Sequence, residues 1–276
     1  MQPVNAHGAN IPALGFGTFR MQGEDVLRMV PQALRLGFRH IDTAQIYGNE
    51  ADVGEAIGSS CVARDDVFLT TKVWVESYRR ADFLASVDES LRKLRTDHVD
   101  LLLLHWPSAS VPLEEQIVTL NDVAKVGKAR HIGVSNFTVS LMREAAAFSD
   151  RPLVTNQVEV HPFIDQAVVI DAARDLGMAV TAYFPMADGR VFADPVLREI
   201  ASSKGRSVAQ VVLRWIVQRE MVVLSKTVSE ARAAENAAIF DFELAPDEMS
   251  VIAKLAGPGG RIVSPDGLAP DWDVAA

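Results

Sequence analysis

Short apolar runs typical of buried strands alternate with longer runs of helical period along most of the chain. The strand candidates span residues 13–17, 38–42, 67–73, 99–106, 129–135, 154–160, 179–185 and 221–227. At least one helical segment follows each candidate, so strand and helix alternate eight times. This is the pattern that a (β/α)8 TIM barrel requires. The sequence therefore predicts an α/β fold with one domain, residues 1–276.

Glycines mark the ends of several predicted helices, at Gly37, Gly127, Gly177 and Gly205, where a left-handed capping residue is common. An open doubly wound sheet is the alternative architecture. The segment GFGTF at 15–19 disfavours it, because it holds two of the three glycines of a dinucleotide fingerprint and leads into a turn. From about residue 257 the chain is rich in turn residues, and we expect this tail near the barrel mouth.

Composition narrows the possible functions. The chain has 276 residues and a net charge of −9 without a basic run, which disfavours a nucleic-acid partner. Cys61 is the single cysteine, which excludes an internal disulfide and a cysteine-based zinc cluster, and no metal site is expected. No basic leader and no run of about 18 apolar residues occur, so we expect a cytoplasmic protein without a membrane partner.

Polar side chains collect at the carboxyl ends of the predicted strands, where barrel enzymes place their active sites. Asp42 and Lys72 end the second and third strands, His105 follows the fourth, and Tyr47 lies in the loop after Asp42. Further polar residues at or near strand ends are Ser135, Asn136, Gln157, Tyr183 and Lys226. A buried lysine requires a partner, and Asp42 is the candidate for Lys72.

Each of these residues also has a structural interpretation. His105 follows four leucines and fits a hydrogen-bonded core histidine, and Tyr47 fits a surface tyrosine. We interpret His7, His40 and His161 as turn or packing residues. The convergence of a carboxylate, a phenol, an ammonium and an imidazole on one barrel mouth favours a site over four unrelated structural roles.

At these positions the sequence resembles the aldo-keto reductases. The resemblance rests on GFRHIDTAQIYGNE (37–50), TTKVW (70–74), LLLLHWP (101–107), IGVSNF (132–137), NQVEVHP (156–162) and LSKTVSEARAAEN (224–236), in the family's order and spacing. It extends from residue 15 to the end of the chain. The tail RIVSPDGLAPDWD (261–273) further resembles that of the bacterial 2,5-diketo-gluconate reductase B type within this family.

The resemblance implies an oxidoreductase that uses NADPH/NADP+ to reduce small aldehydes and ketones, such as α-dicarbonyls and keto-sugars including 2,5-diketo-gluconate. The implied catalytic residues are Asp42, Tyr47, Lys72 and His105. The implied cofactor residues are Asp42 with Gly17, Thr18, Ser135, Asn136, Gln157, Tyr183, Lys226, Thr227, Arg232, Glu235 and Asn236. Within that set, Tyr183 is implied to stack on the nicotinamide, and Lys226 with Arg232 to bind the 2′-phosphate.

Carbonyl reduction needs a hydride on carbon and a proton on oxygen, and the cofactor carries the hydride. We expect Tyr47 to supply the proton, with the Lys72 cation lowering the pKa of its phenol. Asp42 keeps Lys72 charged, and His105 donates a hydrogen bond to the carbonyl oxygen. We expect Phe19, Trp74, Trp106 and Trp272 to form the wall of a shallow substrate site.

Two departures from the family pattern concern the cofactor. Phe184 replaces a serine that helps to bind the pyrophosphate, and Ser225 replaces a proline before Lys226. Two other functions remain open: a Schiff-base aldolase with Lys72 as nucleophile, and a non-catalytic NADPH-sensing subunit. The expected partner is a small carbonyl compound, and a monomer is favoured.

Overall fold

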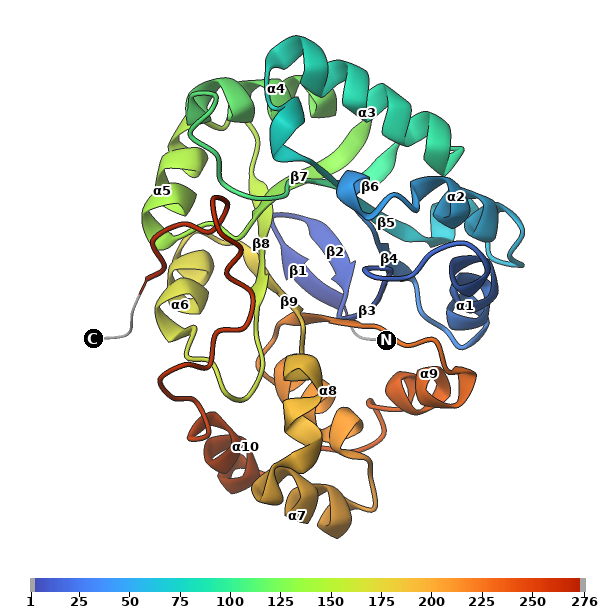
Figure 1. Cartoon of the computed structure of the whole chain (residues 1–276), viewed down its shortest axis with the longest axis vertical. Helices are drawn as coiled ribbons and strands as arrows, with labels where there is room; N and C mark the ends of the chain where they lie inside the picture. The colour runs from blue at the N-terminus through green and yellow to red at the C-terminus, as the bar shows by residue number, and fades with distance from the viewer. Residues whose placement is uncertain (1–2, 274–276) are drawn as a thin grey trace.

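The predicted barrel is confirmed by a computed structural model, which describes residues 3–273. Eight parallel strands close on one another in the order β10-β3-β4-β5-β6-β7-β8-β9 (Figure 1). They are β3 (Leu14–Gly17), β4 (His40–Asp42), β5 (Phe68–Val73), β6 (Val99–Leu104), β7 (Ala129–Ser135), β8 (Leu153–Glu159), β9 (Ala179–Tyr183) and β10 (Val222–Ser225). Each falls within or overlaps a predicted strand.

The helices form a ring around the strands (Figure 1). They are α1 (Glu24–Arg35), α2 (Glu50–Gly58), α3 (Arg80–Leu94), α4 (Leu113–Lys125), α5 (Val139–Phe148), α6 (Ala167–Asp175), α7 (Pro195–Lys204), α8 (Val208–Gln218), α9 (Glu230–Ala237) and α10 (Pro246–Ala253). The four glycines predicted to end helices all have positive φ, between 62° and 97°. Helix α10 was not predicted, because its eight residues include a single fully buried apolar side chain, Ile252.

A hairpin that the sequence analysis missed closes the amino-terminal end of the barrel. Strands β1 (Pro3–Ala6) and β2 (Ala9–Pro12) pair antiparallel across the turn at His7 and Gly8, which both have positive φ. In Figure 1 the hairpin crosses the centre of the barrel. Its residues Ala6, Ala9 and Ile11 pack with Leu101 and Leu103 from inside the barrel. This hairpin plug fills the amino-terminal end of the barrel, so the carboxyl-terminal end is left for the polar residues of the predicted site.

The barrel wall is tightly packed on the side of β7. A Cβ atom on Gly133 would lie 2.7 Å from the carbonyl oxygen of Thr155 and 2.9 Å from Leu103. Only glycine fits this approach of β7 to β8 without a shift of backbone. This close packing fixes the position of β7 against β8, the two strands that carry Ser135 and Gln157.

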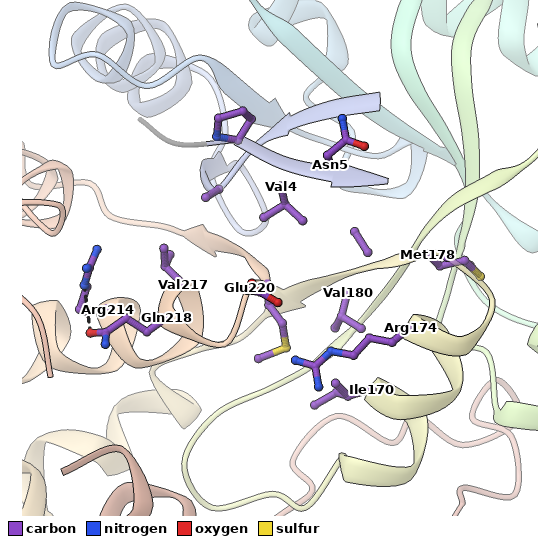
Figure 2. Close-up of a pocket in the computed structure, with 15 residues that line it drawn as sticks. Val4, Asn5, Ile170, Arg174, Met178, Val180, Arg214, Val217, Gln218 and Glu220 are labelled. Atoms are coloured by element: carbon purple, nitrogen blue, oxygen red, sulfur yellow. Dashed lines mark hydrogen bonds between the residues drawn. The ribbon is translucent and has the colours of Figure 1, made fainter. Parts of the chain in front are cut away.

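A cavity of about 540 Å³ lies between the hairpin and helices α6 and α8 (Figure 2). Val4 and Asn5 line one wall, and Arg174, Val180 and Val217 line others. These residues surround the amino-terminal ends of β9 and β10, so the cavity lies at the opposite end of the barrel from the predicted site.

Among residues 3–273, no helix is both long and apolar enough to cross a membrane.

His40 gives the fold a specific sensitivity to acid. Its side chain is fully buried, Nε2 contacts Thr70 Oγ1 at 3.0 Å, and Nδ1 has no partner among the described residues. Burial lowers the pKa of His40 to about 4 from 6.5. The unfolded chain therefore binds a proton on His40 between these pH values that the folded chain does not, and stability falls as the pH drops.

We predict that acidification from pH 6.5 to 4 costs about 3 kcal/mol of unfolding free energy through His40 alone. Urea unfolding of the wild type and of His40→Gln at both pH values measures this contribution as the difference between their two losses. The variant should lose less stability than the wild type. Equal losses would contradict the assignment.

Candidate active site

An ion pair lies buried where β4 and β5 end. Lys72 Nζ lies 2.6 Å from Asp42 Oδ1 and donates a second hydrogen bond to the carbonyl oxygen of Thr43 at 2.9 Å. Both charged side chains are almost completely buried. Burial lowers the pKa of Lys72, and the Asp42 carboxylate opposes this shift. The predicted pairing of Asp42 with Lys72 is therefore present.

The second oxygen of Asp42 binds a residue from across the barrel. Gln157 Nε2, on β8, donates to Asp42 Oδ2 at 2.8 Å. Ser135 Oγ donates to the carbonyl oxygen of Gln157, and Asn136 Nδ2 donates to Ser135 Oγ. Tyr183 Oη donates to Asn136 Oδ1 at 2.8 Å. Side chains from β4, β7, β8 and β9 thus form one hydrogen-bonded set at the same end of the barrel.

Tyr47 lies above this ion pair on the short 3₁₀ helix η1 (Gln45–Tyr47). Its Oη lies 3.5 Å from Lys72 Nζ, and its ring meets the His105 ring edge-on at a centroid distance of 5.6 Å. Gln45 holds η1 in place, because its Oε1 accepts from the backbone N–H of Trp74 and its Nε2 donates to Ser90. The four residues predicted to be catalytic are therefore brought together.

The prediction of a lowered pKa for Tyr47 is wrong for this structure, because the Lys72 cation does not outweigh burial. Burial raises the pKa of Tyr47 well above 10, and the negative charge of Asp42 raises it further. The ammonium of Lys72 is largely neutralised by Asp42 at 2.6 Å, so it does not compensate for the lost hydration of a phenolate. Tyr47 is therefore a phenol that holds its proton at neutral pH.

His105 is neutral. Burial lowers its pKa well below 6.5, and the nearby charge of Lys72 acts in the same direction. Its Nδ1 is buried and has no hydrogen-bond partner within residues 3–273. The Trp74 ring packs against the imidazole edge-on at 5.3 Å. A neutral imidazole beside a protonated phenol provides two hydrogen-bond donors for one oxygen atom.

Two of the four aromatic residues predicted for the substrate wall contact these donors, and the other two contact each other. Phe19, 45% exposed, lies 5.0 Å from the Tyr47 ring, and Trp74 contacts His105. Trp106 is buried and meets the Trp272 ring edge-on at 6.2 Å. Trp272 belongs to the tail, which crosses in front of the β8 side of the barrel in Figure 1.

The residues predicted for the cofactor phosphate lie farther out, from the end of β10 into α9. Lys226 and Arg232 are exposed, and neither forms an ion pair with any residue in 3–273. Thr227 is buried and its Oγ1 accepts from the backbone N–H of Ser229. Glu235 is exposed to solvent, whereas the neighbouring Asn236 is buried. On the neighbouring strand, Gly17 is followed by the buried Thr18, whose Oγ1 donates to the Asp42 carbonyl.

Unusual backbone conformations mark the loops at this end of the barrel. Positive φ occurs at five non-glycine residues there, namely Arg20, Asn136, Phe184, Ala187 and Asp188. Arg20 and Asp188, from the loops after β3 and β9, approach to 3.9 Å. Such strain persists only where surrounding structure enforces it, and it is common at functional sites. Sequence reasoning missed this pair, because no periodicity links two loops so far apart in the chain.

The chain resembles known reductases over nearly all of its length. The model of the Aldo/keto reductase family matches residues 13–256. The methylglyoxal reductase DkgB of Yersinia pestis is 43% identical over 96% of this chain and 100% of its own. The glyoxal reductase of Bacillus subtilis is 39% identical over 90% of each chain.

Solved structures of reductases also resemble this chain in sequence and in fold. A crystal structure provisionally named 2,5-diketo-D-gluconic acid reductase B is 63% identical, with a TM-score of 0.98 over 99% of this chain and 98% of that one. The aldose reductase of Schistosoma japonicum is 30% identical, with a TM-score of 0.88 over 94% of both chains. The protein is therefore an oxidoreductase that belongs to the aldo/keto reductase family.

Proposed function

We propose that the protein reduces small aldehydes and ketones to alcohols with NADPH, with Tyr47 as the general acid. The observation that carries this proposal is the contact of Tyr47 Oη with Lys72 Nζ at 3.5 Å, where Lys72 is itself held by Asp42 at 2.6 Å. The relatives named for methylglyoxal, glyoxal and 2,5-diketo-gluconic acid point to α-dicarbonyls and keto-sugars as substrates.

The residues at the barrel mouth fit a nicotinamide cofactor. The side-chain amides of Asn136 and Gln157 suit the carboxamide, and the Tyr183 ring lies beside them through its bond to Asn136. The exposed cations Lys226 and Arg232 suit a dianionic 2′-phosphate, which arginine can bind with two parallel hydrogen bonds. When bound, NADPH supplies the hydride.

The protein's own residues then stabilise the negative charge that develops on the carbonyl oxygen of the substrate. The Tyr47 phenol donates its proton to the carbonyl oxygen as that oxygen gains negative charge. Neutral His105 donates a hydrogen bond to the same oxygen and fixes its approach. Lys72 stabilises the phenolate that remains, and Asp42 keeps Lys72 charged. The aromatic wall of Phe19, Trp74, Trp106 and Trp272 limits the site to small carbonyl compounds.

The two alternative functions have less support than a reductase has. A Schiff-base aldolase needs an accessible, uncharged lysine, whereas Lys72 Nζ is fully buried and its contacts include Asp42, Thr43 and Tyr47. A sensing subunit would not turn over NADPH in the presence of methylglyoxal, so one assay separates it from a reductase. We further propose that the whole chain acts as one domain and as a monomer, in the cytoplasm where NADPH is regenerated.

Replacement of Tyr47 by phenylalanine tests the proton donor. We expect Tyr47→Phe to lower kcat/KM for butanal about 100-fold or more, the usual contribution of general acid catalysis, because the variant lacks only the hydroxyl. NADPH binding, measured by fluorescence titration, should be unchanged. A variant that keeps more than about 10% of the wild-type rate, which corresponds to a barrier change of less than about 1.4 kcal/mol, would refute this role for Tyr47.

The cofactor preference depends on Arg232. We predict that Arg232→Ala weakens NADPH binding by about 1.5–3 kcal/mol, the value of a hydrogen bond to a charged group, and leaves NADH binding nearly unchanged. Titration of both cofactors measures this difference. Arg35→Ala, an exposed arginine on α1, serves as the control for lost charge. Equal weakening of both cofactors would place Arg232 away from the 2′-phosphate.

A further inference from the structure

The His105 imidazole has few directional contacts of its own. Its Nδ1 is buried without a hydrogen-bond partner among residues 3–273. The rings of Trp74 and Tyr47 meet the imidazole edge-on, at centroid distances of 5.3 and 5.6 Å. Such aromatic contacts allow a range of ring positions, whereas a hydrogen bond weakens steeply as its angle changes. The direction in which His105 points therefore depends mainly on the backbone that carries it.

This backbone lies where the hydrogen bonds of the barrel wall end. The N–H of His105, the residue after β6, donates to the carbonyl oxygen of Val73 at 3.2 Å. The carbonyl oxygen of His105 accepts from Asn136 Nδ2 at 3.0 Å. The next residue, Trp106, is buried and lies beyond the end of the strand. Buried backbone groups need partners, so another part of the chain has to bind the N–H and C=O of Trp106.

A single side chain, Tyr78, binds both of these groups. Its hydroxyl donates to the carbonyl oxygen of Trp106 at 2.8 Å and accepts from the Trp106 N–H at 3.3 Å. Tyr78 is fully buried. Burial raises the pKa of Tyr78, so the hydroxyl keeps the proton that it donates. One phenol thus holds both polar backbone groups of the residue that follows His105.

The loop that carries Tyr78 also carries Trp74. The short 3₁₀ helix η3 (Val75–Ser77) lies between them, and the Ser77 N–H donates to the carbonyl oxygen of Trp74 at 2.9 Å. This loop therefore contacts the His105 region twice. The Trp74 ring packs against the imidazole, and the Tyr78 hydroxyl binds the backbone directly after it.

We propose that Tyr78 is a positioning residue for carbonyl reduction, which holds the His105 imidazole where it can donate to the substrate oxygen. This inference rests on the proposed reductase function. Tyr78 acts through the backbone of Trp106 and takes no part in proton transfer. Without its hydroxyl, two buried backbone groups lose their partner, and the segment that carries His105 is no longer held in one position. A misplacement of about 1 Å can lower a rate by about 100-fold.

Tyr78→Phe tests this role, because it removes the hydroxyl and keeps the ring. We expect kcat/KM for methylglyoxal to fall about 10-fold, as for a modest misplacement of a donor. Thr119→Val is the matched control, since Thr119 is also buried and its hydroxyl donates to a backbone carbonyl, that of Glu115 on α4. The control should stay within about twofold of the wild type, because α4 carries none of the proposed site residues. A Tyr78→Phe variant as active as this control would contradict the proposal.

Removal of the imidazole separates positioning from a general effect on stability. In a His105→Ala background, Tyr78→Phe should change kcat/KM by less than about twofold, because residues that act as a unit are not additive. His105→Gln provides a second background, and thermal unfolding checks that each variant folds. A loss that keeps its full size without the imidazole would show that Tyr78 acts on packing alone, and would overturn the proposal.

Failure of the proposed function is detected separately. Methylglyoxal-dependent oxidation of NADPH by the wild type reports whether the protein is a reductase. The His105 ring can be followed without turnover by carbon-13 NMR, with its signal assigned through its absence in His105→Gln. We expect a single narrow signal in the wild type and in Thr119→Val, and a broadened or divided signal in Tyr78→Phe. A signal in Tyr78→Phe as narrow as in the wild type would overturn the assignment even if the enzyme reduces methylglyoxal.

Discussion

The buried ion pair of Lys72 with Asp42 is the interaction on which the rest of the site depends. A lysine enclosed at the floor of a barrel mouth stays charged only because a carboxylate and a carbonyl oxygen replace its hydration. The pair then fixes its surroundings, since Gln157 bonds to the second Asp42 oxygen and Tyr47 approaches the ammonium. Loss of either charge would leave the other buried and unpaired, and the arrangement of β4, β5 and β8 would lose its common centre.

The closed end of the barrel makes this pair effective. The β1–β2 hairpin covers the amino-terminal end, and the interior between hairpin and site is filled by aliphatic side chains such as Leu101, Leu103 and Val222. The resulting low polarity keeps Tyr47 protonated and His105 neutral, which are the forms needed to donate to a carbonyl oxygen. Burial, more than the lysine charge, sets the protonation states of the two donors.

Much of the fold and of the candidate site was predictable because its signals are local. Strand and helix periodicity gave the barrel, and strand-end positions grouped Asp42, Lys72 and His105. Other features depend on contacts between distant segments: the hairpin plug, the Arg20 to Asp188 contact, and the tail anchored by Glu159. The pKa of Tyr47 was mispredicted for the same reason. Burial by residues from distant segments raises this pKa, and the nearby Lys72 charge, which is evident from the sequence, does not offset the rise.

A double-mutant cycle on Lys72 and Tyr47 tests most directly whether the ion pair acts through the phenol. The measured quantity is kcat/KM for the reduction of methylglyoxal by wild type, Lys72→Met, Tyr47→Phe and the double variant, with folding checked by circular dichroism. If Lys72 serves mainly to stabilise the Tyr47 phenolate, the double variant should be within about threefold of the slower single variant, since residues that act as a unit are not additive. Independent effects that multiply in the double variant would contradict the account.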